Sequence, residues 1–197
     1  AGPSEVEVIA DESANPAFIA ADFLSQAEHG VDSQAMLVTA SESIVEPVMQ
    51  AIREQLDRLP RKEITEKSLS HSRLIVLKDK QEVIDFTNLY APEHLIIQTT
   101  DYADIAGQVE NAGSVFMGPY TPESAGDYAS GTNHTLPTNG YAKAYSGVNL
   151  DSFIKKITFQ EITADGIRLL GGTIRTMAAN EQLDAHKNAV TIRLNTL

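Results

Sequence analysis

Short apolar runs alternate with stretches of helical periodicity between Val6 and Gly118, and this alternation most constrains the fold. Five runs have the length of strands, at residues 6–10, 36–39, 73–77, 94–98 and 114–117. The helical patterns between them start at Asn15–Pro16 and end near His29, start at Ser41 or Ser43 and end before Pro60, and cover residues 80–89 and 102–111. Continuous apolar strands separated by helices are typical of a parallel sheet buried on both faces. We therefore predict an α/β fold with a Rossmann-like, mainly parallel sheet covered by helices.

The regular pattern ends after Gly118. Residues 119–152 carry four glycines, three prolines and four of the six tyrosines of the chain. An irregular stretch of this length is either disordered or functional, and its aromatic content favours function. A short strand is expected at Ile157 and Phe159, followed by helices at 164–180 and 183–194. We thus expect an α/β domain over residues 1–150 and a mixed, mainly helical tail over 151–197.

Charge and composition exclude several classes of function. The chain has 15 Lys+Arg against 27 Asp+Glu, a formal net charge of −12, which argues against binding to nucleic acid or to anionic membranes. No apolar run approaches the roughly 20 residues that span a bilayer. The absence of cysteine removes disulfides and thiolate metal sites, so we expect a cytoplasmic protein whose metal ligands, if any, are nitrogen and oxygen. No glycine-rich nucleotide-binding motif is present.

Two short polar groups could carry chemistry. Gln26 and His29 lie three residues apart at the expected end of the first helix, where the helix dipole favours a cation. Glu93 and His94 follow Pro92 directly before a strand, an arrangement suited to proton transfer. A solvated helix end and a polar turn are the plain alternatives. Because a helix ends at the sheet edge where the next strand begins, His29 and the Glu93–His94 pair should share one edge.

A third group lies in the irregular stretch, over residues 122–134. Asp127 could complete a nitrogen and oxygen metal site, and His134 could donate a hydrogen bond to a substrate. A glycine-rich surface loop is the alternative. Residues 181–186 of the tail would by spacing alone be an ordinary solvated helix face.

At these residues the sequence resembles the histidinol dehydrogenase family. The runs that carry the resemblance are AGPSEVEVIAD, DFLSQAEHG, APEHLIIQT, GSVFMGPYTPESAGDYASGTNHTLPT and LDAHKNAVTIRLN, in the order of the family and from one end of the chain to the other. The resemblance implies a zinc- and NAD-dependent oxidation of L-histidinol to L-histidine, the last step of histidine biosynthesis, in a homodimer.

The resemblance also implies roles for individual residues. The implied zinc ligands are Gln26, His29, Asp127 and His186, with His186 supplied by the tail of the neighbouring subunit. Glu93 and His94 match the catalytic pair, in which His94 takes protons and Glu93 activates water. Ser4, His134 and Glu181 match substrate contacts, and the substrate-binding set also includes His94 and the four zinc ligands.

Members of this family are about twice as long, and the NAD contacts are expected in the N-terminal half that this chain lacks. We therefore expect the chain to be a C-terminal half that retains part of a zinc and histidinol site. On its own, it is not expected to reduce NAD. Apolar Leu183, Val190, Ile192 and Leu194 in the tail need burial, which favours a dimerisation role for residues 151–197. The rival interpretations are a non-catalytic α/β ligand-binding module and a dimerisation fragment, and zinc content distinguishes the first rival from the enzyme.

Overall fold

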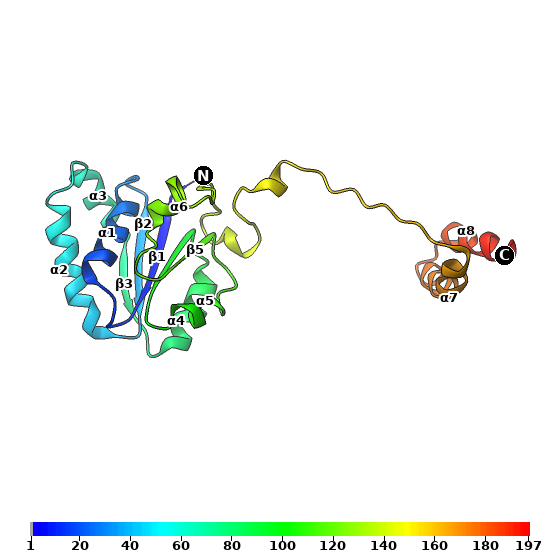
Figure 1. Ribbon diagram of the computed structural model, residues 1–197, viewed down its shortest axis with the longest axis horizontal. Helices are drawn as coiled ribbons and strands as arrows, with labels where there is room; N and C mark the ends of the chain where they lie inside the picture. Colours follow the sequence, from blue (N-terminus) through cyan, green and yellow to red (C-terminus); the bar gives the residue numbers. More distant parts are fainter. Residues whose placement is uncertain (1) are drawn as a thin grey trace. The chain divides into compact units, whose positions relative to one another are not determined.

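A computed structural model describes residues 2–197, which form two compact units. The first unit ends at Phe153 and the second covers Ile154–Leu197. The first unit contains a five-stranded parallel sheet with helices on both faces (Figure 1). The α/β fold with a parallel sheet predicted from the alternating pattern is confirmed.

The strand order of the sheet is β3-β2-β1-β4-β5. The strands are β1 Glu5–Ala10, β2 Gln34–Thr39, β3 Arg73–Val76, β4 His94–Gln98 and β5 Ser114–Met117. β1 is the central strand, and its Val6 is in register with Ala35 of β2 and with His94 of β4. Every residue of β1 and β4 is buried, which explains why apolar residues dominate these runs, although β1 also buries Glu5 and Glu7.

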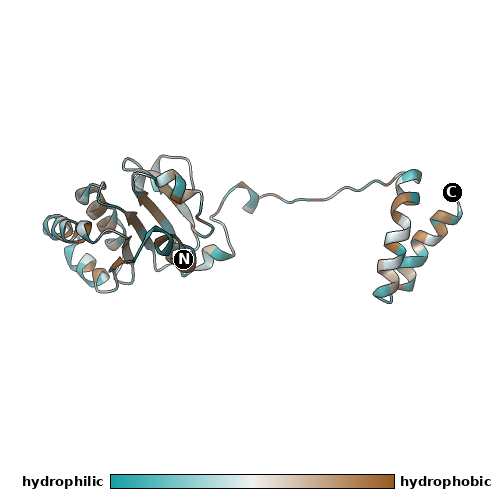
Figure 2. Cartoon of the chain, turned by 90° about the horizontal axis from the view of Figure 1, so that it is seen from below, coloured by the Kyte–Doolittle hydropathy of each residue, from teal (hydrophilic) through white to brown (hydrophobic). Residues whose placement is uncertain are grey.

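Two apolar cores cover the two faces of this sheet. Helices α1 Pro16–Ala27, α2 Val45–Leu56 and α3 Lys62–Leu69 pack on one face, where α1 supplies Ile19 and Phe23. Helices α4 Lys80–Tyr90 and α5 Tyr102–Ala106 pack on the other face, with Val83, Ile84 and Ile105 buried there. Figure 2 shows the resulting arrangement, with hydrophobic strands at the centre and hydrophilic residues on the outer helices.

The ends of α1 and α4 determine where the polar groups lie. Asn15 caps α1 by accepting a hydrogen bond from the Ala17 N–H, and Pro16 fits the first helical position because it needs no donor. The helix ends at Ala27, so His29 lies just beyond it. α4 ends at Tyr90, and the left-handed backbone of the capping residue Ala91 (φ 58°) turns the chain through Pro92 into β4.

Several boundaries differ from the sequence-based predictions. The single helix expected before Pro60 is a short 3-10 turn, Glu42–Ile44, followed by α2, and α3 was not predicted. α5 ends at Ala106 rather than near residue 111, because Gly107 follows it. The irregular stretch contains one short helix, α6 Glu123–Tyr128, and two further 3-10 turns, Tyr141–Lys143 and Leu150–Ser152.

The second unit is a pair of helices, α7 Ala164–Asn180 and α8 Asp184–Asn195. A Cβ atom on Gly171 would lie 2.8 Å from Leu194 Cδ1, so the glycine lets the two helices approach closely. The strand expected at Ile157 and Phe159 is wrong: both residues are exposed, and the extended chain there pairs with no other strand of the described residues. Over residues 2–197, no helix combines the length and apolar character needed to span a bilayer.

Candidate metal and proton-transfer site

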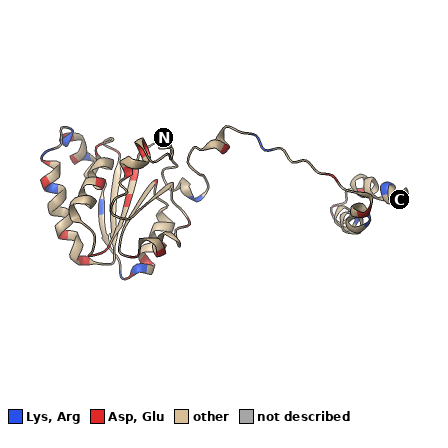
Figure 3. Ribbon diagram, in the orientation of Figure 1, with Lys and Arg blue, Asp and Glu red and all other residues tan. Residues whose placement is uncertain are grey.

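The polar groups singled out in the first unit gather at the amino ends of the parallel strands. His29 follows α1, which leads into β2, while Glu93 and His94 stand at the start of β4. Burial chiefly lowers the pKa of the His94 ring, and His29 lies close enough to add to this lowering. Figure 3 shows acidic residues on β1 and on α6, two elements that meet at this edge. The site is therefore at the edge opposite to the one where open α/β sheets usually bind ligands.

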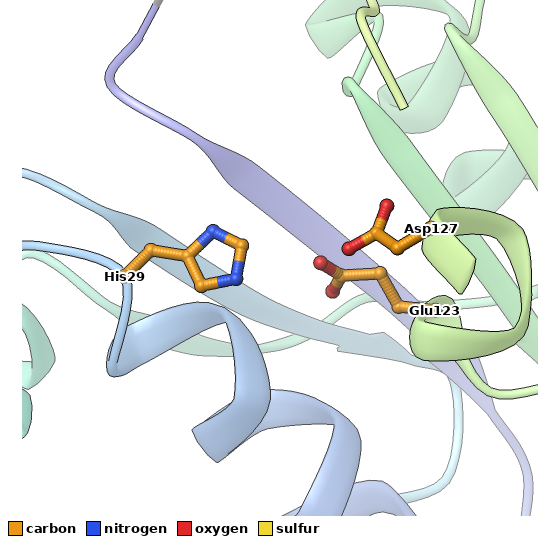
Figure 4. Close-up of side chains that lie close together, drawn as sticks. All are labelled: His29, Glu123 and Asp127. Atoms are coloured by element: carbon orange, nitrogen blue, oxygen red, sulfur yellow. The ribbon is translucent and has the colours of Figure 1, made fainter. Parts of the chain in front are cut away.

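Three side chains converge as a possible metal site. His29, Glu123 and Asp127 each present one ligand atom, and these atoms all lie within 4.8 Å of one another (Figure 4). Glu123 and Asp127 are four residues apart on α6, so they share one helix face. Ligands around zinc lie at about 2.0–2.2 Å from the ion. A nitrogen and two carboxylate oxygens at this mutual spacing fit such an ion with small side-chain movements.

Gln26 joins this group through Glu123. The Gln26 side chain is fully buried, at the residue before the last one of α1. With its amide nitrogen towards Glu123, it donates hydrogen bonds to Glu123 Oε1 at 2.7 Å and to Oε2 at 3.1 Å. The opposite orientation would set its oxygen against carboxylate oxygens, so hydrogen bonding assigns the amide.

The packing of α6 brings Glu123 to this position. A Cβ atom on Gly126 would lie 2.7 Å from the Phe116 ring of β5, a contact that the packed structure does not tolerate. The glycine therefore allows α6 to lie against the sheet. Glu123 is only 1% exposed as a result.

Glu93 and His94 are both held by the backbone of Glu5. The Glu5 N–H donates to Glu93 Oε2 at 2.9 Å, and His94 Nδ1 lies 3.0 Å from the Glu5 carbonyl oxygen. Because a carbonyl only accepts, Nδ1 carries the proton and the lone pair is on Nε2. Nε2 is buried and has no hydrogen-bond partner among the described residues. The imidazole is therefore arranged as a base.

Burial and like charges shift the pKa values at this edge. Burial lowers the pKa of His94, which keeps the ring neutral. Burial, opposed by the Glu5 N–H and reinforced by the charges of Glu5 and Asp127, raises the pKa of Glu93 to about 7. Burial, with the charges of Asp127, Glu93 and Asp22, raises the pKa of Glu123 to about 9. So many acids close together favour a cation among them.

The remaining predicted site residues make no side-chain hydrogen bond to this group among the described residues or belong to the second unit. Ser4 is half-buried beside β1, and its carbonyl accepts a hydrogen bond from the Gln34 N–H at 3.0 Å. His134 is exposed in the stretch after α6. Glu181 directly follows α7 and His186 is exposed on α8, so both belong to the second unit, which is described by itself.

A sequence model of the histidinol dehydrogenase family matches residues 1–194. The chain belongs to the histidinol dehydrogenase family. It is 68% identical to the histidinol dehydrogenase of Bacteroides thetaiotaomicron over all of its 197 residues, which are 46% of that relative. It is 58% identical to the chloroplastic histidinol dehydrogenase of Arabidopsis thaliana, of which it covers 42%.

A solved structure agrees with this assignment. The crystal structure of histidinol dehydrogenase from Elizabethkingia anophelis matches with a TM-score of 0.94 and 57% identity, over all of this chain and 45% of that one. The chain thus spans less than half the length of the histidinol dehydrogenases that it matches. Activities and partners of the whole enzymes are therefore proposals for this chain.

Glu123 is the residue at the site to which sequence reasoning gave no role. It lies in the polar run 122–134, but only Asp127 and His134 of that run were singled out. The four-residue spacing between Glu123 and Asp127 is the signal that could have found it, since it places two carboxylates on one face of a short helix.

Proposed function

We propose that this chain carries the zinc and substrate site of a histidinol dehydrogenase, which oxidises L-histidinol to L-histidine with NAD as hydride acceptor. One observation carries the proposal in a chain of this family. The possible metal ligands His29 and Asp127 meet the buried Glu93–His94 pair at a single edge of the sheet. A metal position beside an acid and a base suits the oxidation of an alcohol to a carboxylate, which needs a polarised oxygen and two proton transfers.

The zinc ligands would be Gln26, His29 and Asp127 of this unit together with His186, which we propose is supplied by the tail of a neighbouring subunit. The donor set fits, because it consists of two imidazoles, a carboxylate and an amide oxygen, and the chain has no cysteine to compete. When bound, zinc would act as a Lewis acid that orients and polarises the substrate.

The chain's own residues would move the protons. His94 has an unprotonated, unpartnered Nε2, so it can accept a proton from the substrate hydroxyl as hydride leaves the carbinol carbon. Glu93, with a pKa of about 7, can take a proton from the water that adds to the aldehyde-level intermediate. Two hydride transfers and one water then convert the alcohol to the carboxylate.

Binding of the small cationic substrate would use further groups. We propose contacts from Ser4, His134 and Glu181 in addition to the zinc ligands and His94, in a homodimer whose sites are shared between subunits. The contacts to NAD are expected in the part of the full-length enzyme that lies outside this chain. A cytoplasmic location stays a prediction, and one relative, that of Arabidopsis thaliana, is named chloroplastic.

Zinc and histidinol binding test this proposal. Purified chain is dialysed against zinc, its metal content is measured, and L-histidinol is then titrated calorimetrically. We expect one zinc per chain and histidinol binding that requires the metal. His29→Ala should remove both. The matched control is His71→Ala, because His71 is exposed at the turn before β3 and away from the site.

Loss of zinc in both variants, or in neither, would contradict the site. We further expect no NADH from this chain with histidinol and NAD, so absorbance at 340 nm should stay flat. A non-catalytic ligand-binding module would bind no zinc, which is how the same measurement separates that alternative. A dimerisation fragment would differ from the enzyme in another way, because its His29→Ala variant would lose metal with histidinol binding unchanged.

A further inference from the structure

We propose that Glu123 is a positioning residue that holds the Gln26 amide so that its oxygen, and not its nitrogen, is offered to the metal. The inference rests on the proposed zinc site and assigns Glu123 a role outside the ligand set. It explains how the Gln26 amide, a weak zinc ligand, is held with its oxygen free for the metal.

The argument starts from the two ends of an amide. Gln26 can present either the N–H donors of Nε2 or the carbonyl oxygen Oε1 to a cation, and only the oxygen has a lone pair available for a metal. The two ends differ little in shape, so packing alone selects weakly between them. Hydrogen bonding has to decide the orientation.

Glu123 fixes the orientation of the Gln26 amide. Both of its carboxylate oxygens accept from the Gln26 nitrogen, at 2.7 and 3.1 Å. Beside a bound cation Glu123 is ionised, and turning the amide over would then bring its oxygen against the same two carboxylate oxygens with no donor between them. The nitrogen is therefore committed to Glu123, and the oxygen is the end left for a ligand.

Burial distinguishes Glu123 from its neighbour on the same helix face. Glu123 is 1% exposed and already engaged with Gln26, whereas Asp127 is half-buried and its carboxylate makes no hydrogen bond to another described residue. Asp127 is thus the carboxylate of α6 on which no hydrogen bond competes with an ion. Although the Glu123 carboxylate lies within 4.8 Å of the His29 and Asp127 ligand atoms, both of its oxygens are engaged by Gln26, so we infer that it acts through that residue, as residues that orient metal ligands commonly do.

A double-mutant cycle on zinc affinity tests this role. Zinc dissociation constants are measured by competition with a chromophoric chelator for the wild-type chain, Glu123→Gln, Gln26→Ala and the double variant. We expect Glu123→Gln to weaken zinc binding by about 10- to 100-fold. In the Gln26→Ala background, Glu123→Gln should weaken zinc binding by less than about threefold, because the residue through which Glu123 acts is absent.

Asp127→Asn is the matched comparison, because a direct ligand should lose as much affinity with Gln26→Ala as without it. An equal loss for Glu123→Gln in both backgrounds would overturn the positioning role and make Glu123 a ligand. No loss in the wild-type background would overturn it as well. Glu123→Met, which keeps the side-chain length but removes both acceptors, should lose at least as much as Glu123→Gln in the wild-type background, and circular dichroism verifies that each variant is folded.

The wild-type measurement separates this inference from the proposed function. Failure of the wild-type chain to bind zinc would overturn the proposed site, and the inference with it. Zinc binding in the wild type with additive variants would overturn the inference alone.

Discussion

A carboxyl group lies in the middle of the central strand, and its neutralisation should change the stability of the protein in a pH-dependent way. Glu7 of β1 is fully buried under α4, where it is hydrogen-bonded to the Thr87 hydroxyl. That hydroxyl also donates to the Val83 carbonyl at 2.9 Å. One hydroxyl hydrogen cannot serve both acceptors, so a protonated Glu7 that donates to Thr87 satisfies the whole chain of bonds.

The size of this change in unfolding free energy follows from the pKa of Glu7. Burial, only partly opposed by the Thr87 hydrogen bond, raises the pKa of Glu7 from 4.5 to about 8. Between these values the unfolded carboxyl is ionised while the folded one keeps its proton. The folded state therefore binds more protons, and stability is lost as the pH rises from 4.5 towards 8. The full loss from this one group is about 5 kcal/mol.

Glu7→Gln should abolish this contribution, because the amide is a neutral replacement whose nitrogen donates to Thr87. Urea unfolding of the variant and the wild type, followed by circular dichroism, measures the difference in unfolding free energy. We expect Glu7→Gln to exceed the wild type by about 4–5 kcal/mol at pH 8 and by under about 1 kcal/mol at pH 5. Exposed Glu63 on α3 provides the control, since Glu63→Gln should give no such pH-dependent difference.

An equal difference at both pH values, or a variant less stable than the wild type at pH 8, would refute the reasoning. Other buried acids contribute to the pH dependence of the wild type. The comparison of the two proteins at each pH removes their contribution.

Three further changes test the packing and capping described above. Gly126→Ala should destabilise the protein by about 1–3 kcal/mol in urea unfolding, because the new Cβ would lie 2.7 Å from the Phe116 ring; an unchanged midpoint would contradict the close approach of α6. Gly172→Ala, in α7 where nothing lies within 4 Å of the added Cβ, should instead raise helix stability by up to about 1 kcal/mol, seen as a higher thermal midpoint for the second unit. Asn15→Ala removes the side chain that accepts from the Ala17 N–H and should cost about 1 kcal/mol, whereas Asn15→Ser should restore most of it.

The inner strands β2 and β4 were predictable from sequence because burial on both faces leaves a nearly continuous apolar run. α3 was missed for the opposite reason, since its inward positions are polar. Thr65 and Ser68 are fully buried there and satisfied by hydrogen bonds, Thr65 Oγ1 to the Arg61 carbonyl and Ser68 Oγ to the Ser33 carbonyl. A periodicity of apolar residues cannot show a helix that buries hydroxyl groups.

The strand expected at Ile157 and Phe159 failed because alternation indicates an apolar face but supplies no partner for the backbone. At the site, connectivity alone placed His29 and the start of β4 at one edge of the sheet. The role of Glu123 could not be read in the same way. It depends on Gln26, a residue remote in sequence, and on the approach of α6 that Gly126 permits.

The central place of β1 has a consequence for how the molecule opens. The strand is bonded to β2 on one side and to β4 on the other, so its peptide groups cannot take up deuterium until the sheet separates. Glu5, which holds Glu93 and His94, belongs to the same strand. Local breathing of outer helices would leave that acid–imidazole pair assembled, and only global unfolding would take it apart.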